Sequence, residues 1–369
     1  MSTSVPRSGI LTVIERSGSH LLQVVIPPSW LDMYPKSPRY KHVELVAELL
    51  PRISHLVIIT SGGYDMSRIC RAFEDHSADR LERLKFVASP GLDELFVLHA
   101  PRLRSLHLRS VETWPATISE NLTHIHLVSR LNPETLERSL KNSSRLKEIR
   151  IDGVYQLPEQ IGSPSKISLI PGVRLVITRS HTTVASLFAL GSTNTLSITA
   201  NTNVTDHSIT SSLNLALPRD ISFFRNLNDI TTVHLKLIDS GEDPYCHIPR
   251  AITVILRCST VDRETLHIES KHNLRNPRFP NEMETEIIPE RLPAIRALNY
   301  LRPLDLKNVV ELKMEGFVGK RGIQGFELYH FLQHMPALRR ITTGDDNGEI
   351  FLFALSITGR SASVVVEGT

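Results

Sequence analysis

The chain has 369 residues, enough to bury a sizeable core in one large domain or two ordinary ones. Its 42 basic and 39 acidic residues leave a net charge of +3, which is too small for a general polyanion binder. Three scattered cysteines, Cys70, Cys246 and Cys258, argue against a disulfide framework and a zinc knuckle and favour a reducing compartment. Because no secretory signal or apolar span is visible, we expect a cytoplasmic or nuclear protein without membrane contact.

One short apolar template, L-x-x-[LI]-x-L, recurs along the chain and is clearest in "LRSLHL" (103–108) and "LTHIHL" (122–127). A spare match, "LDELFV" (92–97), lies close to its neighbours. Each match predicts a short strand whose middle apolar residue anchors it in the core. These anchors are Leu56, Leu84, Leu106, Ile125, Ile149, Leu175, Leu196, Val233, Leu266, Leu312 and Ile341. The first five steps, of 19 to 28 residues, fit the period of about 20–29 residues in leucine-rich repeats, but the steps lengthen to 37 and 33 at Val233 and Leu266.

The segments between the strands carry helix signals. "PRYKHVELVAELLP" (38–51) has apolar residues at helical spacing, and "GFELYHFLQHMP" (325–336) ends at a proline. In "LNPETLERSLKN" (131–142), Asn132 can cap the helix and Pro133 suits its first turn. Other connections are too short for a helix and predict a 3₁₀ turn or an irregular loop.

Repeated helix, turn and strand predict an α/β, leucine-rich-repeat-like solenoid, a curved parallel sheet with helices and loops on its outer face. A doubly wound α/β fold is the main rival, but its long Val/Ile strands and Gly-rich crossover loop are absent from the sequence. We expect a flexible N-terminus over 1–15 and one solenoid domain over 16–369, degenerate after about residue 200.

Alternation along the strands predicts which side chains face outward. If Leu106 is in the core, then Ser105, His107 and Arg109 lie on the opposite face, and the same rule applies to the other strands. The outward residues on those strands are His55, Val57, Arg83, Lys85, His124, His126, Glu148, Arg150, Asp152, Thr232, His234 and Lys236.

Strands about 4.8 Å apart would align some of these side chains across the sheet. The residues that we expect to bind a partner are Lys85, His107, His124, His126 and Arg150. Their charges suit an acidic or phosphorylated segment, and we expect the histidines to strengthen attraction as the pH falls towards about 6.5. Glu148 and Asp152 flank Arg150 and could neutralise it. The alternative is a solvated polar face without a ligand.

Sharper chemical interpretations fail. His107, His124 and His126 could lie close together, but no Cys or carboxylate at ligand spacing completes the set, so no metal site is predicted. The glycine-rich stretch before the last helix is no phosphate loop, because Lys320 is followed by Arg321. "GDDNGEI" (344–350) lacks calcium-loop spacing and predicts a hairpin turn. Residues 180–218, rich in Ser, Thr and Asn, predict a neutral repeat or a phospho-regulated loop. No catalytic constellation or cofactor motif is present, so we predict a non-enzyme.

"APRLRSLHL", "NLTHIHLVS", "SRLKEIRIDGV" and "LPRISHLVI" resemble the repeats of fungal F-box proteins with irregular leucine-rich-repeat C-terminal regions. "RSGSHLLQVVI" (16–26) resembles the segment that follows the F-box in many of them. The F-box itself, a helical N-terminal segment, is absent from this chain. The resemblance implies the substrate-recognition part of a cullin-type ubiquitin ligase.

The sequence therefore predicts an intracellular protein-binding module. The expected partner is a protein of unknown identity and, if an F-box is restored upstream, a Skp1-type adaptor. We expect no specific nucleic acid among the binding partners. The alternative is a stand-alone structural or regulatory scaffold with no ubiquitin connection.

Overall fold

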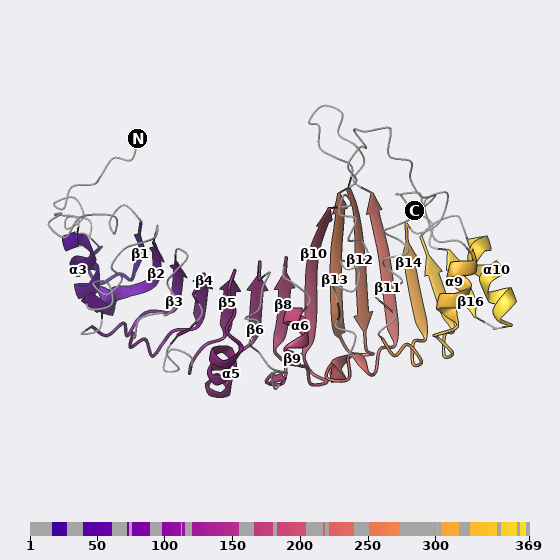
Figure 1. Ribbon diagram of the computed structural model, residues 1–369, viewed down its shortest axis with the longest axis horizontal. Coiled ribbons are helices and arrows are strands. Elements are labelled where there is room, and N and C mark those ends of the chain that lie inside the picture. The colour runs from indigo at the N-terminus through magenta and orange to yellow at the C-terminus, as the bar shows by residue number, and fades with distance from the viewer. Residues whose placement is uncertain are drawn as a thin grey trace, which may run out of the picture. The chain divides into compact units, whose positions relative to one another are not determined.

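The computed structural model divides into two compact units, residues 1–162 and 163–369 (Figure 1). The expected flexible N-terminus (1–15) and the spare match at 92–97 lie outside the described residues. The single domain expected from residue 16 onward stays a prediction. The described residues are 17–27, 40–60, 72–73, 76–88, 98–111, 113–114, 120–154, 166–179, 183–203, 217, 221–239, 251–273, 301, 304–316, 325–344, 348–359 and 362–366.

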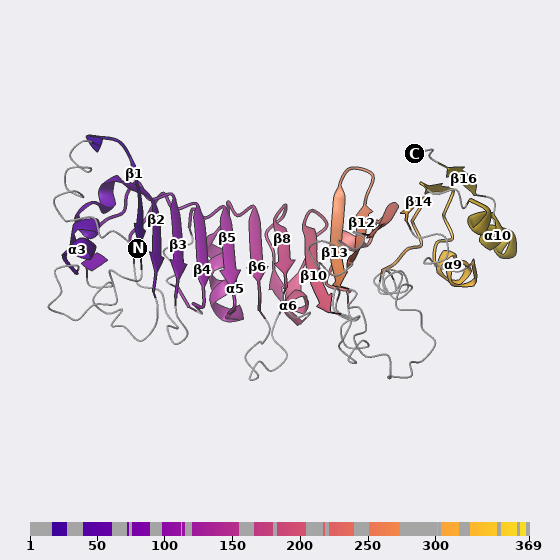
Figure 2. The same cartoon turned by 90° about the horizontal axis from the view of Figure 1, so that it is seen from above.

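The described part of the first unit forms a sheet of strands that follow one another in chain order (Figure 2). The strands are β1 (Leu22–Ile26), β2 (Ile53–Ile59), β3 (Arg83–Val87), β4 (Ser105–Arg109), β5 (His124–Val128) and β6 (Glu148–Asp152). Every neighbouring pair is parallel. The lateral partners include the anchors Leu56, Leu84, Leu106, Ile125 and Ile149, none of which is more than 1% exposed. The prediction that these five anchors lie buried on adjacent parallel strands is confirmed.

A tight turn introduces several of these strands. The backbone N–H of Leu103 donates to the carbonyl of Ala100, and that of Leu146 donates to Ser143. Pro101 lies at the second position of the first turn, where its fixed φ favours the bend. The first leucine of the template is therefore the last residue of a turn, which explains its regular distance from the anchor.

A residue with positive φ ends several of the strands. Ser110, Ser129 and Gly153 lie one residue after β4, β5 and β6 with φ of 60°, 73° and 65°. The backbone hydrogen bonds between neighbouring strands continue one residue past β4 and β5. The N–H of Ser110 donates to the carbonyl of Val128, and the N–H of Ser129 donates to the carbonyl of Asp152. Each of these residues lies four positions after its anchor, so turn, strand and exit form one repeated structural unit.

The predicted helices form at the expected places. They are α3 (Tyr40–Glu48), followed by the 3₁₀ helix η1 (Leu50–Arg52), then α5 (Pro133–Asn142) and, in the second unit, α9 (Gly325–Leu332). The Asn132 side chain accepts a hydrogen bond from the Thr135 N–H at 3.1 Å, which confirms it as the α5 cap. Leu136 and Leu140 on one face of α5 are buried.

The second unit has a mixed sheet in the order β8-β10-β13-β12-β11-β14-β15-β16. Its described strands are β8 (Arg174–Thr178), β10 (Thr195–Asn203), β11 (Thr232–Asp239), β12 (Ala251–Ser259), β13 (Glu264–Asn273), β14 (Glu311–Glu315), β15 (Arg340–Thr343) and β16 (Ser363–Val366). A small separate sheet pairs β7 (Ile167–Ser168) with β9 (Phe188–Ala189). Short helices α6 (Thr183–Ser186) and η3 (Arg225–Leu227) complete the described part of this unit between β8 and β11.

The sequence did not predict the order of the strands at the centre of this sheet. β12 is antiparallel to both β11 and β13, so the three strands form a meander. The meander is placed so that β13 pairs with β10 and β11 pairs with β14, both in parallel. The lengthened repeat step from Val233 to Leu266 contains the extra antiparallel strand, β12. The four strands β10 to β13 have 8 to 10 residues each and are visibly longer than their neighbours in Figure 1.

The hairpin expected around residues 344–350 is wrong. The segment that follows is a helix, α10 (Gly348–Thr358). Its buried residues Phe351, Ala354 and Leu355 have the i, i+3, i+4 spacing of a helix face. An apolar run without polar alternation fits either element, and here packing between α10 and α9 selects the helix.

The α/β class with mostly parallel strands is thus established for the described residues. Gly316, one residue after β14, has the same positive φ as the exits in the first unit, at 73°. A Cβ added there would clash with the backbone carbonyl oxygen of Leu237 on β11. Gly172 in the same unit has φ of 81° but open space around it.

We therefore expect Gly316→Ala to lower the free energy of unfolding by about 3 kcal/mol, because it combines strain with a backbone clash. Gly172→Ala is the matched control and should cost about 1 kcal/mol through strain alone. Urea denaturation followed by circular dichroism measures both. Equal losses for the two variants would contradict the close packing of β11 against the β14 exit.

Candidate binding surface

Four of the five predicted partner-binding residues form a line across the first unit. Lys85 pairs laterally with His107, His107 with His126, and His126 with Arg150. Lys85 and Arg150 are exposed at the two ends, and the histidines between them are half-buried. The sheet register brings them together because each lies one residue after an anchor.

The fifth residue, His124, lies two positions before His126 on the same face of β5. It is exposed, and its lateral partners are Ser105 and Glu148. The prediction that Asp152 is exposed is wrong, since this side chain is only 7% exposed. It lies at the end of β6, where its carbonyl accepts the N–H of Ser129 from the neighbouring exit turn. The predicted line therefore lies on a face of the sheet that is exposed at Lys85, His124 and Arg150 but buried at Asp152.

His107 and His126 pack directly against each other. Their ring centroids are 4.2 Å apart and the rings are tilted by 40°. Burial, with the charge of His126 next, lowers the pKa of His107 to about 4. Burial also lowers the pKa of His126, and the Arg150 guanidinium acts in the same direction. Nε2 of His126 is buried and has no hydrogen-bond partner among the described residues.

These lowered pKa values correct one prediction from the sequence. Because the pKa of His107 is lowered to about 4, its ring adds no positive charge as the pH falls towards 6.5. His107 therefore stays neutral near pH 6.5, and it does not strengthen attraction for an anion there. The permanent charges of the lysine and arginine side chains carry the electrostatics of this face.

His55 and His124 are each oriented by the hydroxyl group of the preceding residue. Nδ1 of His55 lies 2.9 Å from Ser54 Oγ, and Nδ1 of His124 lies 2.8 Å from Thr123 Oγ1. Ser54 already donates its proton to the carbonyl of Leu22, and Thr123 donates to that of Arg104. Each hydroxyl can then only accept, so each Nδ1 carries the proton and donates it, which fixes the ring and turns Nε2 away from the hydroxyl.

No carboxylate lies at the outward positions of β2 to β5 that pair laterally with one another. These positions are His55, Val57, Ile59, Arg83, Lys85, Val87, Ser105, His107, Arg109, His124, His126 and Val128. We call their basic members, Arg83, Lys85 and Arg109, together with the four histidines, the cationic patch. All three basic side chains are exposed and form no ion pair with another described residue.

The basic residues of the cationic patch are better candidates for anion binding than Arg150. Arg150 shares β6 with Glu148 and Asp152, whereas no carboxylate lies at the outward positions of β3 and β4, which carry Arg83 and Arg109. The sequence had placed Arg83 and Arg109 on the outward face but not in the site. Strand alternation was the signal that could have found them, combined with the absence of Asp and Glu from the same face.

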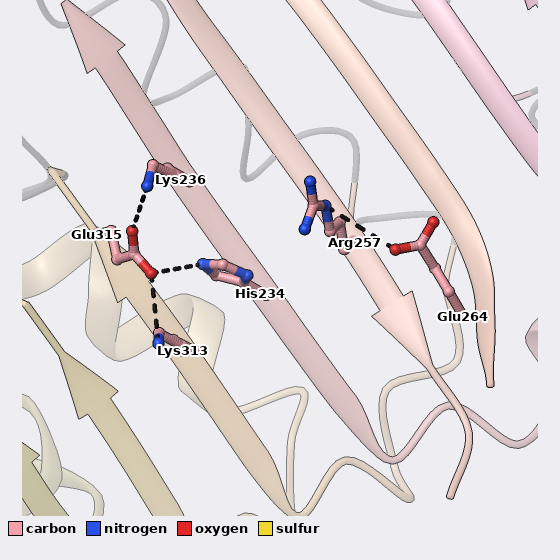
Figure 3. A network of polar contacts seen from close by, with 6 residues as sticks. All are labelled: His234, Lys236, Arg257, Glu264, Lys313 and Glu315. Carbon is pink, nitrogen blue, oxygen red and sulfur yellow. Dashed lines mark hydrogen bonds and ion pairs between the residues drawn. The ribbon is translucent and has the colours of Figure 1, made fainter. Parts of the chain in front are cut away.

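In a second polar cluster, which lies in the second unit, the basic side chains are paired with carboxylates (Figure 3). Glu315 on β14 accepts from Lys236 Nζ at 2.8 Å and from His234 Nε2 at 3.0 Å, and Lys313 Nζ lies 3.4 Å away. The hydrogen bond from Lys236 is the largest of the effects that lower the pKa of Glu315. On β12, Arg257 lies 3.9 Å from Glu264. The basic groups of this cluster are paired within the protein, which leaves less charge for a ligand.

The described residues contain no candidate metal site, and Cys258 is no reactive thiol. They hold no group of three or more side chains that could bind a metal ion. Cys258 is fully buried, and burial raises the pKa of its thiol far above the ordinary value, so it is no nucleophile. Most of the glycine-rich stretch that contains Lys320 lies outside the described residues.

The lowered pKa of His107 predicts a specific pH dependence of stability. Between pH 6.5 and about 4, the unfolded chain binds a proton that folded His107 does not, so stability is lost as the pH falls through this window. We expect the wild type to lose on the order of 1 kcal/mol more than His107→Asn between pH 7 and pH 5, after allowance for solvent screening.

Urea denaturation followed by tryptophan fluorescence measures this difference, because both tryptophans, Trp30 and Trp114, belong to the first unit. The exposed His124→Asn variant, on the same face, is the control for general acid effects and should follow the wild type more closely. Identical pH profiles for the wild type and His107→Asn would contradict the buried, neutral state of the ring pair.

Comparison with known proteins assigns no family to the chain. No protein-family model, no curated protein and no solved structure matches it. In the part of the chain that the structure describes, no helix is both long and apolar enough to span a membrane. What the cationic patch binds is therefore inferred from its own side chains.

Proposed function

We propose that this protein is a protein-binding module of the leucine-rich-repeat-like solenoid type, and that the cationic patch binds an acidic or phosphorylated segment of its partner. The repeated unit of turn, five-residue strand and positive-φ exit supports the solenoid. The observation that carries the binding function is the absence of carboxylates from the outward face of β2 to β5.

The chemistry of the patch favours an anionic ligand. Arg83 and Arg109 offer planar guanidinium groups, which bind carboxylate or phosphate oxygens through paired hydrogen bonds. Lys85 lies between them, two residues after Arg83 on β3 and diagonal to Arg109 on β4. The half-buried rings of His107 and His126 lie beside these cations, tilted by 40° to each other, and their burial means that water screens a bound anion less than on an open surface.

A partner protein suits this surface better than a nucleic acid. Its basic residues lie within two neighbouring strands, which are about 4.8 Å apart, whereas a nucleic acid backbone is usually followed by a longer basic track. The overall net charge of +3 gives little long-range attraction for a polyanion. A short acidic stretch or a single phosphorylated side chain matches the size of the patch.

The resemblance to fungal F-box proteins extends this proposal to the substrate-recognition part of a cullin-type ubiquitin ligase. A stand-alone structural or regulatory scaffold without a ubiquitin connection is the alternative. The two differ in whether the native gene product co-purifies with the ligase adaptor. Both use the same partner-binding surface, so the test of that surface does not depend on the choice between them.

The patch is tested by removing its charge. We expect the triple variant Arg83→Ser, Lys85→Ser, Arg109→Ser to bind a 15-residue polyglutamate peptide at least tenfold more weakly than the wild type, as measured by fluorescence anisotropy. Tenfold corresponds to about 1.4 kcal/mol, a modest loss for three charged contacts. Circular dichroism establishes that the variant is folded.

The matched control is Arg102→Ser, Arg145→Ser, Lys147→Ser, which removes three exposed charges from the segments that precede strands of the same unit. It should change the affinity less than twofold. Equal losses in the two variants would reduce the binding to non-specific attraction and contradict the proposal. Tighter binding of a single-stranded DNA 15-mer than of the peptide would assign the patch to nucleic acid instead.

A further inference from the structure

The outward face of the first unit carries an apolar corner next to the cationic patch. Val25 on β1 is 54% exposed and pairs laterally with Val57 on β2. Ile59, two residues further along β2, pairs with Val87 on β3. The four side chains adjoin one another on the same face of three neighbouring strands, and we call them the apolar corner.

The apolar corner is in direct register with the cations. Val57 is the lateral partner of Lys85, and Val87 is the lateral partner of Arg109. A ligand that crosses the strands therefore passes from apolar to basic side chains without an intervening polar row. The exposed Val25 and the partly exposed Val57 beside it are favourable to cover with an apolar ligand group, because this removes apolar surface from water.

The spacing between the two regions is set by the sheet. The valines Val25 and Val57 lie on β1 and β2 and the basic side chains on β3 and β4, so the centres of these two pairs of strands lie two strand spacings apart, on the order of 10 Å. An extended peptide advances about 3.3 Å per residue. Three residues of an extended partner segment therefore span the distance.

We propose that the partner segment crosses the strands in an extended conformation and carries a bulky apolar residue three positions from its anionic residue. This inference rests on the proposed function, because it specifies which acidic or phosphorylated segments the patch selects. The apolar residue covers Val25 and Val57, while the anion contacts Lys85 and its arginine neighbours. The distance between the apolar corner and the basic side chains, and not charge alone, then defines which segments bind.

The experiment uses 12-residue peptides of Gly, Ser and Gln that contain one phosphoserine. In one pair of peptides the leucine lies three positions before the phosphoserine in one member and three positions after it in the other. A second pair has the leucine six positions before or after the phosphoserine. One further peptide has no leucine. Fluorescence anisotropy with the full-length chain measures each dissociation constant. We expect one member of the three-residue pair to bind at least fivefold more tightly than both the six-residue peptides and the leucine-free peptide.

Variants assign this preference to the apolar corner. Val25→Ser, at an exposed position, should reduce the preference to less than twofold and leave binding of the leucine-free peptide unchanged. Val365→Ser, at an exposed valine in the second unit, is the control and should keep the preference. A set of peptides with glutamate in place of phosphoserine shows whether a carboxylate is recognised with the same spacing rule.

The outcomes separate the two proposals. Equal affinity for all phosphopeptides, with loss of binding in the Arg83, Lys85 and Arg109 variant, would overturn the spacing inference and leave the proposed function standing. No binding of any anionic peptide would overturn the proposed function itself. A spacing preference that survives Val25→Ser unchanged would contradict the assignment to the apolar corner.

Discussion

The register of the parallel strands is the constraint on which the first unit depends. The carbonyl of Glu82 accepts the N–H groups of both Arg104 and Ser105, and the carbonyl of Arg104 accepts those of Thr123 and His124 in the same way. Each new strand is thereby aligned at its first residue with the one before it. A slip of one residue would turn every leucine anchor out of the core and every histidine into it. Burial of the anchors and backbone pairing therefore enforce the same register, and that register places Lys85 beside His107 and Val57 beside Lys85.

Features that depend on local pattern could be predicted from the sequence. The L-x-x-[LI]-x-L template contains the end of a turn and the inward side of one strand, so it predicts the anchors, the alternation and hence the line from Lys85 to Arg150. The α5 helix was equally predictable, since Asn132, Pro133 and the spacing of Leu136 and Leu140 all indicate the same element. In these segments local preference and tertiary packing agree.

Features that depend on a distant partner could not be predicted. Nothing in "AITVILRCS" states that β12 pairs between β11 and β13 or that β13 returns to β10. α10 was mistaken for a hairpin because an apolar run fits both elements until its neighbour is known. Burial between neighbouring strands, with the charge of His126 next, lowers the pKa of His107, so the expected gain of charge near pH 6.5 does not occur. The same holds for charge: Lys236 and Lys313 look as available as Lys85 in sequence, but Glu315 pairs with both.

Two clusters that both contain basic side chains and histidines thus have different capacities to bind an anion. The cluster around Glu315 satisfies its charges internally, whereas the cationic patch leaves Arg83, Lys85 and Arg109 exposed. Covalent footprinting with diethyl pyrocarbonate, which labels exposed histidines, tests this account most directly. With saturating acidic peptide, labelling of His55 and His124 in the patch should fall at least threefold, while labelling of the exposed His330 and His334 on and after α9 stays unchanged. Unchanged labelling of the patch histidines, or protection of His330 and His334 instead, would contradict it.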